Sequence, residues 1–323
     1  MEFRAAVNTG FLGGMRNRFM TYQDDRPLAE KIRIASRIPG LSGVELGYPR
    51  DFRDPAELRK LLSDSGLAVA AVNYGARRAG TWWRGSYASS DPAERAEVVG
   101  ELKKAMDAAR DLGCSMVTTC PNNDGSDYLF EIDYGESYRF LEESFRTAAG
   151  HDREVKIALE YKTGEPRTQC LLGNAGETLT LCRRIGLTNV GVALDFGHSL
   201  FAGERPAQAA ALIALENRLF CVHLSDNDRR WDWDMSPGSF NPWETLEFFF
   251  HLKLHGYDGW FSFDVFPKEI DASATFSEAL ETARRLFAAA DKIEIGTAGE
   301  LSSRRNPVES LRFMYGLLGR QEA

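Results

Sequence analysis

Short apolar runs alternate with amphipathic segments along almost the whole chain. Eight of these runs are rich in Val, Ala, Leu and Phe and end at polar or turn residues, as buried parallel strands do. The predicted strands are residues 3–8, 42–47, 67–73, 115–119, 155–161, 189–195, 219–224 and 260–266. Helical periodicity fills segments between them, namely residues 27–37, a helix opening at 54–57, and residues 90–112, 134–150 and 176–186.

Helix-start signals support these assignments. Asp54-Pro55-Ala56-Glu57 combines a capping carboxylate, a proline suited to the first turn and an acidic residue beside the helix amino terminus. Ser90-Asp91-Pro92-Ala93-Glu94 repeats the arrangement before the long helix that ends near Leu112. Both sequences therefore predict that a helix follows the preceding strand or loop.

Eight strand–helix alternations without a linker predict the α/β class and a closed (β/α)8, or TIM, barrel. A doubly wound open sheet is the alternative, but no Gly-x-Gly-x-x-Gly follows a predicted strand. We assign the barrel to residues 1–298. Residues 299–323 form a C-terminal extension, in which residues 307–319 (PVESLRFMYGLLG) predict one extra helix.

Composition narrows the possible functions. The chain has 323 residues and a formal charge of −8, and no basic stripe that would grip nucleic acid. No apolar run approaches the ~20 residues that span a bilayer, and the first residues lack a signal pattern. The five cysteines have no Cys-x-x-Cys spacing and are expected to be small buried hydrophobes. We therefore expect a cytoplasmic protein that binds neither nucleic acid nor membrane.

Polar residues at the ends of four neighbouring strands form the first candidate site. The carboxyl ends of all strands of a (β/α)8 barrel open onto one face, where its chemistry lies. Buried carboxylates that share a site repel one another unless a cation holds them. Oxygen-rich ligation with a single imidazole favours Mn²⁺, Mg²⁺ or Co²⁺. The predicted ligands of this inner site are Glu160, Asp195, His223 and Asp264.

A second acidic group lies further along the same segments. His198 follows Asp195 by three residues, and Asp232-Trp233-Asp234 follows the seventh strand. An Asp-x-Asp sequence can direct two carboxylates at one cation, and Asp195 could bridge two metals, as carboxylates do in two-metal sites. The competing interpretation is a solvated acidic loop, with Asp226 and Asp228 offsetting Arg229 and Arg230.

The ordered set of these motifs resembles the xylose isomerase-like superfamily, and L-rhamnose isomerase-like sugar isomerases above all. Those enzymes carry Glu-x-Lys, Asp-x-x-His, a His followed by Asp-x-Asp, and a final Asp. This chain has Glu160-Tyr161-Lys162, Asp195 with His198, His223 with Asp232 and Asp234, and Asp264. Residues 121–128 (PNNDGSDY) are also similar to a substrate-loop segment of that group, and the resemblance covers roughly residues 3–290.

The resemblance implies a metal-dependent interconversion of an aldose and a ketose by a 1,2-hydride shift. One metal would be held by the inner site, and a second by Asp195, His198, Asp232 and Asp234. Lys162 would stabilise charge on the substrate carbonyl oxygen, or would instead form a salt bridge to Glu160 or Asp195. The residues that we count as catalytic are Lys162, Glu160, Asp264 and Asp232.

The sugar is expected to lie among aromatic and amide side chains. The chain has no histidine before His151, although the sugar isomerases use one from their amino-terminal half. Either Asn8, Asn73 or Tyr74 takes its place, or the substrate is already open-chain. Aromatic faces can cover sugar C–H groups. Predicted substrate contacts are Asn8, Trp82, Trp83, Asp124 and Phe266, with Phe11, Phe19 and Trp231 nearby. We expect a free sugar and a homo-oligomer, either dimer or tetramer.

The same residues are also considered for other functions. The first is a one-metal ketose 3-epimerase with Glu160 and Asp264 as acid and base, although such enzymes typically end strand eight with Glu. A metal-dependent lyase acting on an oxidised sugar would use the same barrel. A phosphodiesterase like the barrel AP endonucleases would need a histidine-rich three-zinc cluster and a basic face. A chain with five histidines and a formal net charge of −8 fits that requirement badly. A binding subunit without chemistry would have lost Lys162 or a ligand, and all are present.

Overall fold

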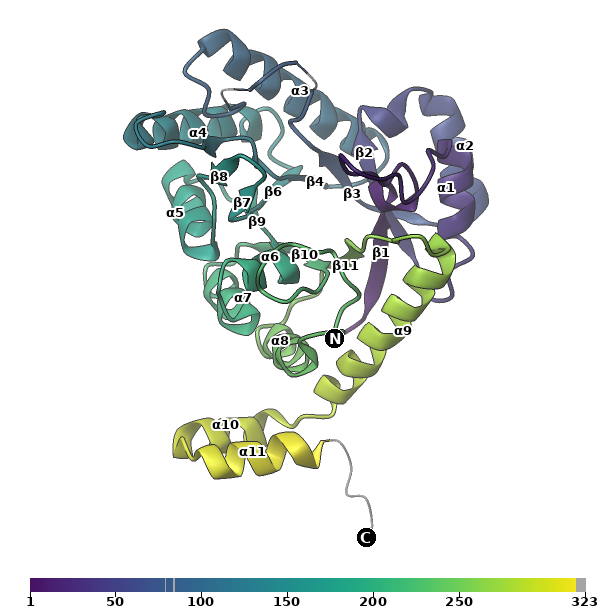
Figure 1. Cartoon of the computed structure of the whole chain (residues 1–323), viewed down its shortest axis with the longest axis vertical. Helices are drawn as coiled ribbons and strands as arrows, with labels where there is room; N and C mark the ends of the chain where they lie inside the picture. Colours follow the sequence, from purple (N-terminus) through teal and green to yellow (C-terminus); the bar gives the residue numbers. More distant parts are fainter. Residues whose placement is uncertain (79, 84, 318–323) are drawn as a thin grey trace.

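The computed structural model describes residues 1–78, 80–83 and 85–317, and within them eight parallel strands close into a barrel (Figure 1). The order around the barrel is β1-β11-β10-β9-β6-β4-β3-β2. The strands are β1 (Arg4–Asn8), β2 (Gly43–Tyr48), β3 (Ala68–Tyr74), β4 (Met116–Thr119), β6 (Lys156–Glu160), β9 (Val190–Asp195), β10 (Leu219–Leu224) and β11 (Trp260–Phe263). Each coincides with one of the predicted strands, so the predicted (β/α)8 barrel is confirmed.

Helices surround the barrel (Figure 1). They are α1 (Leu28–Ala35), α2 (Pro55–Ser65), α3 (Pro92–Asp111), α4 (Tyr134–Ala149), α5 (Ala175–Ile185), α6 (Phe196–Phe201), α7 (Pro206–Leu215), α8 (Pro242–Leu254) and α9 (Ala272–Asp291), with two 3-10 turns, η1 (Thr9–Leu12) and η2 (Arg50–Phe52). The predicted caps are present, because the Asp54 carboxylate accepts from two first-turn amides of α2 and Asp91 caps α3. Local capping chemistry therefore fixes where these helices begin.

The chain ends in two short helices rather than the single one expected. α10 (Ile295–Arg304) and α11 (Pro307–Gly316) follow α9 outside the helix layer, and Tyr315 of α11 packs edge-on against Trp243 of α8 (Figure 1). The expected boundary at residue 299 falls inside α10. The missed helix has no proline at its start and no side-chain cap, which are the signals that revealed its neighbour. Residues 318 and 319 of the predicted helix lie outside the described residues.

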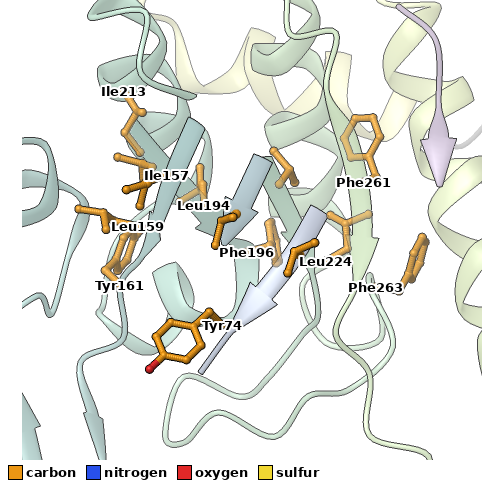
Figure 2. Packing of buried hydrophobic residues seen from close by; sticks show 14 of the residues in the cluster. Tyr74, Ile157, Leu159, Tyr161, Leu194, Phe196, Ile213, Leu224, Phe261 and Phe263 are labelled. Atoms are coloured by element: carbon orange, nitrogen blue, oxygen red, sulfur yellow. The ribbon is translucent and has the colours of Figure 1, made fainter. Parts of the chain in front are cut away.

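Apolar side chains fill the space between the strands and the helix layer. Leu159, Leu194, Leu224 and Phe263 are almost completely buried in this core (Figure 2). Phe3 stacks on Phe261, with ring centroids 4.7 Å apart and planes inclined by 14°. Such packing holds the strand ends in fixed positions. No helix among the described residues combines the length and the apolar character needed to cross a membrane.

The loops that follow β4 and β6 form a small antiparallel sheet. The sequence pattern did not indicate this sheet. It pairs β5 (Gly125–Ser126) with β8 (Thr168–Cys170), which also pairs with β7 (Gly164–Glu165). Strands of two or three residues are too short to show an alternating pattern. This sheet ties together the loops that follow Thr119 and Glu160, two neighbouring strand ends.

Gly191 allows an unusually close approach between β9 and β10. The register between these strands shifts between Leu219 and Cys221, and the Phe220 ring lies over Gly191. A methyl group on Gly191 would come within 2.5 Å of that ring and 2.6 Å of the Arg218 carbonyl oxygen. Because one of these obstacles is backbone, the neighbours cannot simply rotate away.

Gly191→Ala should therefore lower the free energy of unfolding by about 1–3 kcal/mol through overpacking. Gly100→Ala is the matched control, because Gly100 lies inside α3 and a methyl group there meets no atom within 4 Å. That control should raise the stability by about 0.5–1 kcal/mol, since alanine is the better helix former. Urea unfolding followed by circular dichroism measures both, and equal stability of the two variants would contradict the close approach.

Candidate metal centre

The four residues predicted for the inner site lie together at the carboxyl end of the barrel. Glu160 and Asp195 are the last residues of β6 and β9, His223 is in β10, and Asp264 directly follows β11. One potential ligand atom from each lies within 4.8 Å of those of the others, and all four residues are buried. They converge because β6, β9, β10 and β11 are adjacent and in register, with His223 opposite Asp195.

Two carboxylate oxygens of this group have no hydrogen-bond partner among the described residues. They are Asp195 Oδ2 and Asp264 Oδ1, and both are buried. The other oxygen of Asp195 accepts from the His198 backbone amide (2.9 Å) and from Ser225 Oγ (3.0 Å). Buried carboxylate oxygens are rarely left unpaired, because the lost hydration is costly. The donor set of three carboxylates and one imidazole therefore fits a divalent cation such as Mn²⁺, Mg²⁺ or Co²⁺.

The electrostatics of this group also indicate a demand for positive charge. Burial opposes ionisation of Glu160, but His223, His198 and Lys162 outweigh it and lower the pKa of Glu160 to about 2. Burial and the neighbouring carboxylates Glu160, Glu45 and Asp195 raise the pKa of Asp264 well above its usual value. Burial alone would lower the pKa of His223, yet the surrounding carboxylates raise it well above its usual value.

The second predicted group is assembled in part. His198 Nε2 lies 3.2 Å from Asp232 Oδ2, and His198 Nδ1 lies 3.3 Å from Glu160 Oε1, so the two groups are contiguous. Burial and the charges of Asp195 and Asp232 act in opposite directions on His198, and the net effect raises its pKa to about 10. Asp234 is half-buried with a left-handed backbone (φ 49°), and burial and the charge of Asp232 raise its pKa.

Lys162 projects toward the outer group. It pairs with Asp232 Oδ2 at 2.9 Å and with Glu165 Oε1 at 2.8 Å, rather than with Glu160 or Asp195 as the salt-bridge alternative held. These charges outweigh burial and raise the pKa of Lys162. Tyr161, between Glu160 and Lys162, is buried and donates its hydroxyl to Glu204 at 2.6 Å.

The residues predicted to contact the substrate differ in how far they are buried and in what they pack against. Trp83 is exposed, whereas Trp82 is buried beneath the Arg78 guanidinium. Phe266 packs edge-on against Tyr22, and the Asn8 side chain accepts from the Gly10 amide. Trp82 and Asn8 therefore have structural contacts of their own.

Asp124, which the sequence analysis expects to contact the substrate, is hydrogen-bonded within the protein. Both of its carboxylate oxygens accept hydrogen bonds from the 86–88 segment, through the Ser86, Tyr87 and Ala88 amides and the Ser86 hydroxyl. Asp124 is buried, and each of its two carboxylate oxygens accepts two of these hydrogen bonds. Its role is to anchor the loop that follows β3 to the loop that follows β4.

Other residues named from the sequence also find structural partners. Asn73 donates to Thr118, Phe11 packs against the core, and Trp231 packs against Phe201. The Tyr74 hydroxyl is buried without a partner among the described residues, while Phe19 is exposed.

The acidic residues that follow β10 divide into two kinds. Asp226 caps the loop by accepting from the Phe240 and Asn241 amides, and Asp228 accepts from the Trp233 ring nitrogen. The solvated-loop interpretation thus fits Asp228, while the buried Asp226 is a structural cap. Asp228 also accepts from the Arg230 backbone amide, while the Arg229 side chain pairs with Glu244.

Glu45 is a residue of this region that the sequence analysis missed. It is fully buried in β2, and its Oε2 lies 3.2 Å from His223 Nε2. A charged residue inside an otherwise apolar predicted strand was the available signal. Glu165 was missed as well, because its contact with Lys162 depends on the short β7–β8 hairpin.

A profile of the xylose isomerase-like TIM barrel family matches residues 32–286, which is well over half of the chain. The chain belongs to this family. It is 25% identical over 228 residues to a xylose isomerase from Ruegeria pomeroyi. That alignment covers 67% of this chain and 52% of the relative, so the chain spans about half the length of the curated relative it matches.

Solved structures share the fold at low sequence identity. A xylose isomerase domain protein from Alicyclobacillus acidocaldarius has a TM-score of 0.69 at 18% identity, covering 90% of this chain and 100% of that one. An L-ribulose 3-epimerase has a TM-score of 0.69 at 21% identity, covering 95% and 100%. A D-allulose 3-epimerase from Methylomonas sp., solved with D-allulose, has a TM-score of 0.70 at 19% identity, covering 88% and 96%.

Asp234→Asn should stabilise the protein in the presence of a chelator, because it removes a charge that Asp232 repels. Asparagine tolerates the left-handed backbone at this position. We expect the free energy of unfolding to rise by about 1 kcal/mol. Asp228→Asn, on the same loop but pairing with Trp233, is the control that should gain nothing. A fall in the melting temperature of Asp234→Asn would show that its carboxylate is favourably placed even without a cation.

Proposed function

We propose that this protein is a divalent-metal-dependent sugar isomerase that interconverts a free aldose and its ketose. The observation that carries the proposal is the buried group of Glu160, Asp195, His223 and Asp264, with two unpaired carboxylate oxygens. Family membership supports an isomerase-type reaction on a sugar, since the relatives include a xylose isomerase and sugar epimerases. The inner four residues would hold the cation, which supplies chelation of sugar oxygens and polarisation of a carbonyl.

The side chains around this group would bind and orient an open-chain sugar. Lys162 is held by Asp232 and Glu165 with its ammonium at the barrel mouth, where it can stabilise negative charge on a carbonyl oxygen. Asp195, His198 and Asp232 are joined by hydrogen bonds at the edge of the inner group. A 1,2-hydride shift needs charge stabilisation at two adjacent sugar oxygens, and His198 and Asp232 would act on the second of them.

One observation favours epimerisation as a second candidate. Asp232 Oδ2 already contacts both Lys162 and His198, so the charge of this one carboxylate is paired without a cation. A one-metal ketose 3-epimerase would then use Glu160 and Asp264, which flank His223 Nδ1 at 3.1 and 3.5 Å, as acid and base. Of the two, the isomerase accounts for Lys162 and the Asp232–Asp234 pair, and it is our first choice.

The proposal is tested by incubating the protein, loaded with Mn²⁺ or Co²⁺, with a panel of free aldoses and ketoses. Conversion of an aldose into its 2-ketose, lost with a chelator and restored by the metal, is the expected result. The same reaction in deuterated water separates the candidates, since proton transfer washes solvent deuterium into the product and a hydride shift does not. No conversion of any aldose or ketose by the metal-loaded protein would contradict both.

Asp195→Asn should abolish both Mn²⁺ binding and turnover while the barrel still folds. Asp195 contributes an unpaired oxygen to the inner group and contacts the outer one, so its loss weakens both. Isothermal titration with Mn²⁺ and the melting temperature in a chelator separate the loss of metal from the loss of structure. Full turnover by this variant would contradict the metal-dependent mechanism.

Lys162→Gln should lower kcat by about 10²–10³-fold, the effect typical of removing one group that stabilises a developing negative charge. Mn²⁺ affinity should change far less, because Lys162 is not among the four inner residues. Lys156→Gln is the matched control. Lys156 is exposed and begins β6, the strand that Lys162 follows, at the opposite end of the barrel. Turnover by Lys162→Gln equal to that of this control would exclude the proposed role.

A further inference from the structure

A carboxylate lies beneath the inner group, inside the barrel. Glu45 is in β2, and its fractional exposure is 0%. Ionised carboxylates are not buried without close partners, because the desolvation cost is large. The contacts of each Glu45 oxygen therefore show what the residue does.

The two oxygens of Glu45 have different partners. Oε1 accepts from the Thr118 hydroxyl of β4 and from the Asn73 amide nitrogen of β3, the latter at 3.3 Å. Oε2 lies at ion-pair distance, 3.2 Å, from His223 Nε2, and among the described residues neither of these two buried atoms makes a hydrogen bond. One oxygen is thus committed to two donors on neighbouring strands, and this orients the other toward the imidazole.

The second nitrogen of His223 faces the inner group. Nδ1 lies 3.1 Å from Glu160 Oε1 and 3.5 Å from Asp264 Oδ2. A neutral imidazole carries a proton on one nitrogen and a lone pair on the other, and only the nitrogen with the lone pair binds a metal. If Nε2–H donates to Glu45, the lone pair of Nδ1 is directed into the group of carboxylates.

We propose that Glu45 is a positioning residue that fixes the Nε2–H tautomer of His223, so that Nδ1 binds the divalent cation. This inference rests on the proposed metal site and assigns a role to a residue outside its four ligands. Carboxylates behind metal-binding histidines orient the ring and strengthen the ligand, and their loss typically lowers metal affinity about 10–100-fold. A plain structural ion pair would affect stability without selecting which nitrogen binds.

Glu45→Gln is the informative variant because it preserves shape and reverses the hydrogen bond. The Thr118 hydroxyl and the Asn73 amide both donate to Oε1, so the glutamine amide oxygen is expected to take that position. Its NH₂ group would then face His223 Nε2 and donate to it. This places the imidazole proton on Nδ1, which faces the cation site with a hydrogen instead of a lone pair.

The first measurement uses the wild-type protein alone. Two-bond ¹H–¹⁵N spectra of ¹⁵N-histidine-labelled protein with saturating Mg²⁺ resolve the tautomer of each of the five histidines, and a His223→Gln sample assigns the signal. We expect His223 to be protonated at Nε2 and unprotonated at Nδ1. A proton on Nδ1 of His223 in the Mg²⁺-loaded protein overturns the proposal, whatever any variant does.

The second measurement compares Mn²⁺ dissociation constants by isothermal titration. Glu45→Gln should bind Mn²⁺ about 10–100-fold more weakly than wild type and should show His223 protonated at Nδ1. Asp124→Asn is the control, since Asp124 is another buried carboxylate but anchors a loop, so it should lower the melting temperature with little change in Mn²⁺ affinity.

The outcomes distinguish this inference from the proposed function. Mn²⁺ binding by wild type with equal affinity in Glu45→Gln overturns the role of Glu45 and leaves the metal site intact. Failure of wild type to bind Mn²⁺ or Mg²⁺ contradicts the metal site itself. If Glu45→Gln does not fold, a proton on Nδ1 of wild-type His223 still overturns the proposal.

Discussion

The concentration of buried carboxylates at one end of the barrel is the constraint on which the rest of the site depends. Four carboxylates are almost fully removed from water and belong to four different strands. Glu45 lies within β2, Glu160 and Asp195 end β6 and β9, and Asp264 follows β11. Such charges persist only where positive charge is supplied. His223 by itself contacts three of these four carboxylates, which come from β2, β6 and the end of β11.

The barrel explains how residues far apart in sequence reach one another. Parallel strands in register bring their carboxyl ends to one face, and the packed layer between strands and helices fixes their spacing. The loops add a second level of order. Asp124 anchors the loop after β3, and Glu165 on a short hairpin holds Lys162 beside Asp232. The fold thus positions the charges, and the loops position the cationic group that faces them.

Sequence patterns predicted the strands and the inner group because both have local signals. An apolar run marks a buried strand, and a charged residue near its carboxyl end marks a candidate site residue, as at Glu160 and Asp195. Contacts formed by folding have no such signal. The role of Asp124 depends on amides 36–38 residues away, and Glu45 contacts His223 across the barrel. α10 was missed because it lacks a cap that the sequence would reveal.

A divalent cation bound among the four inner residues can be located by anomalous diffraction from crystals grown with Mn²⁺. We expect a strong peak bounded by Glu160, Asp195, His223 and Asp264, with the His223 Nδ1 atom as the imidazole ligand. A second peak beside His198 and Asp232 would support the two-metal isomerase over the one-metal epimerase. Ordered crystals in saturating Mn²⁺ without a peak at the inner group would contradict the account.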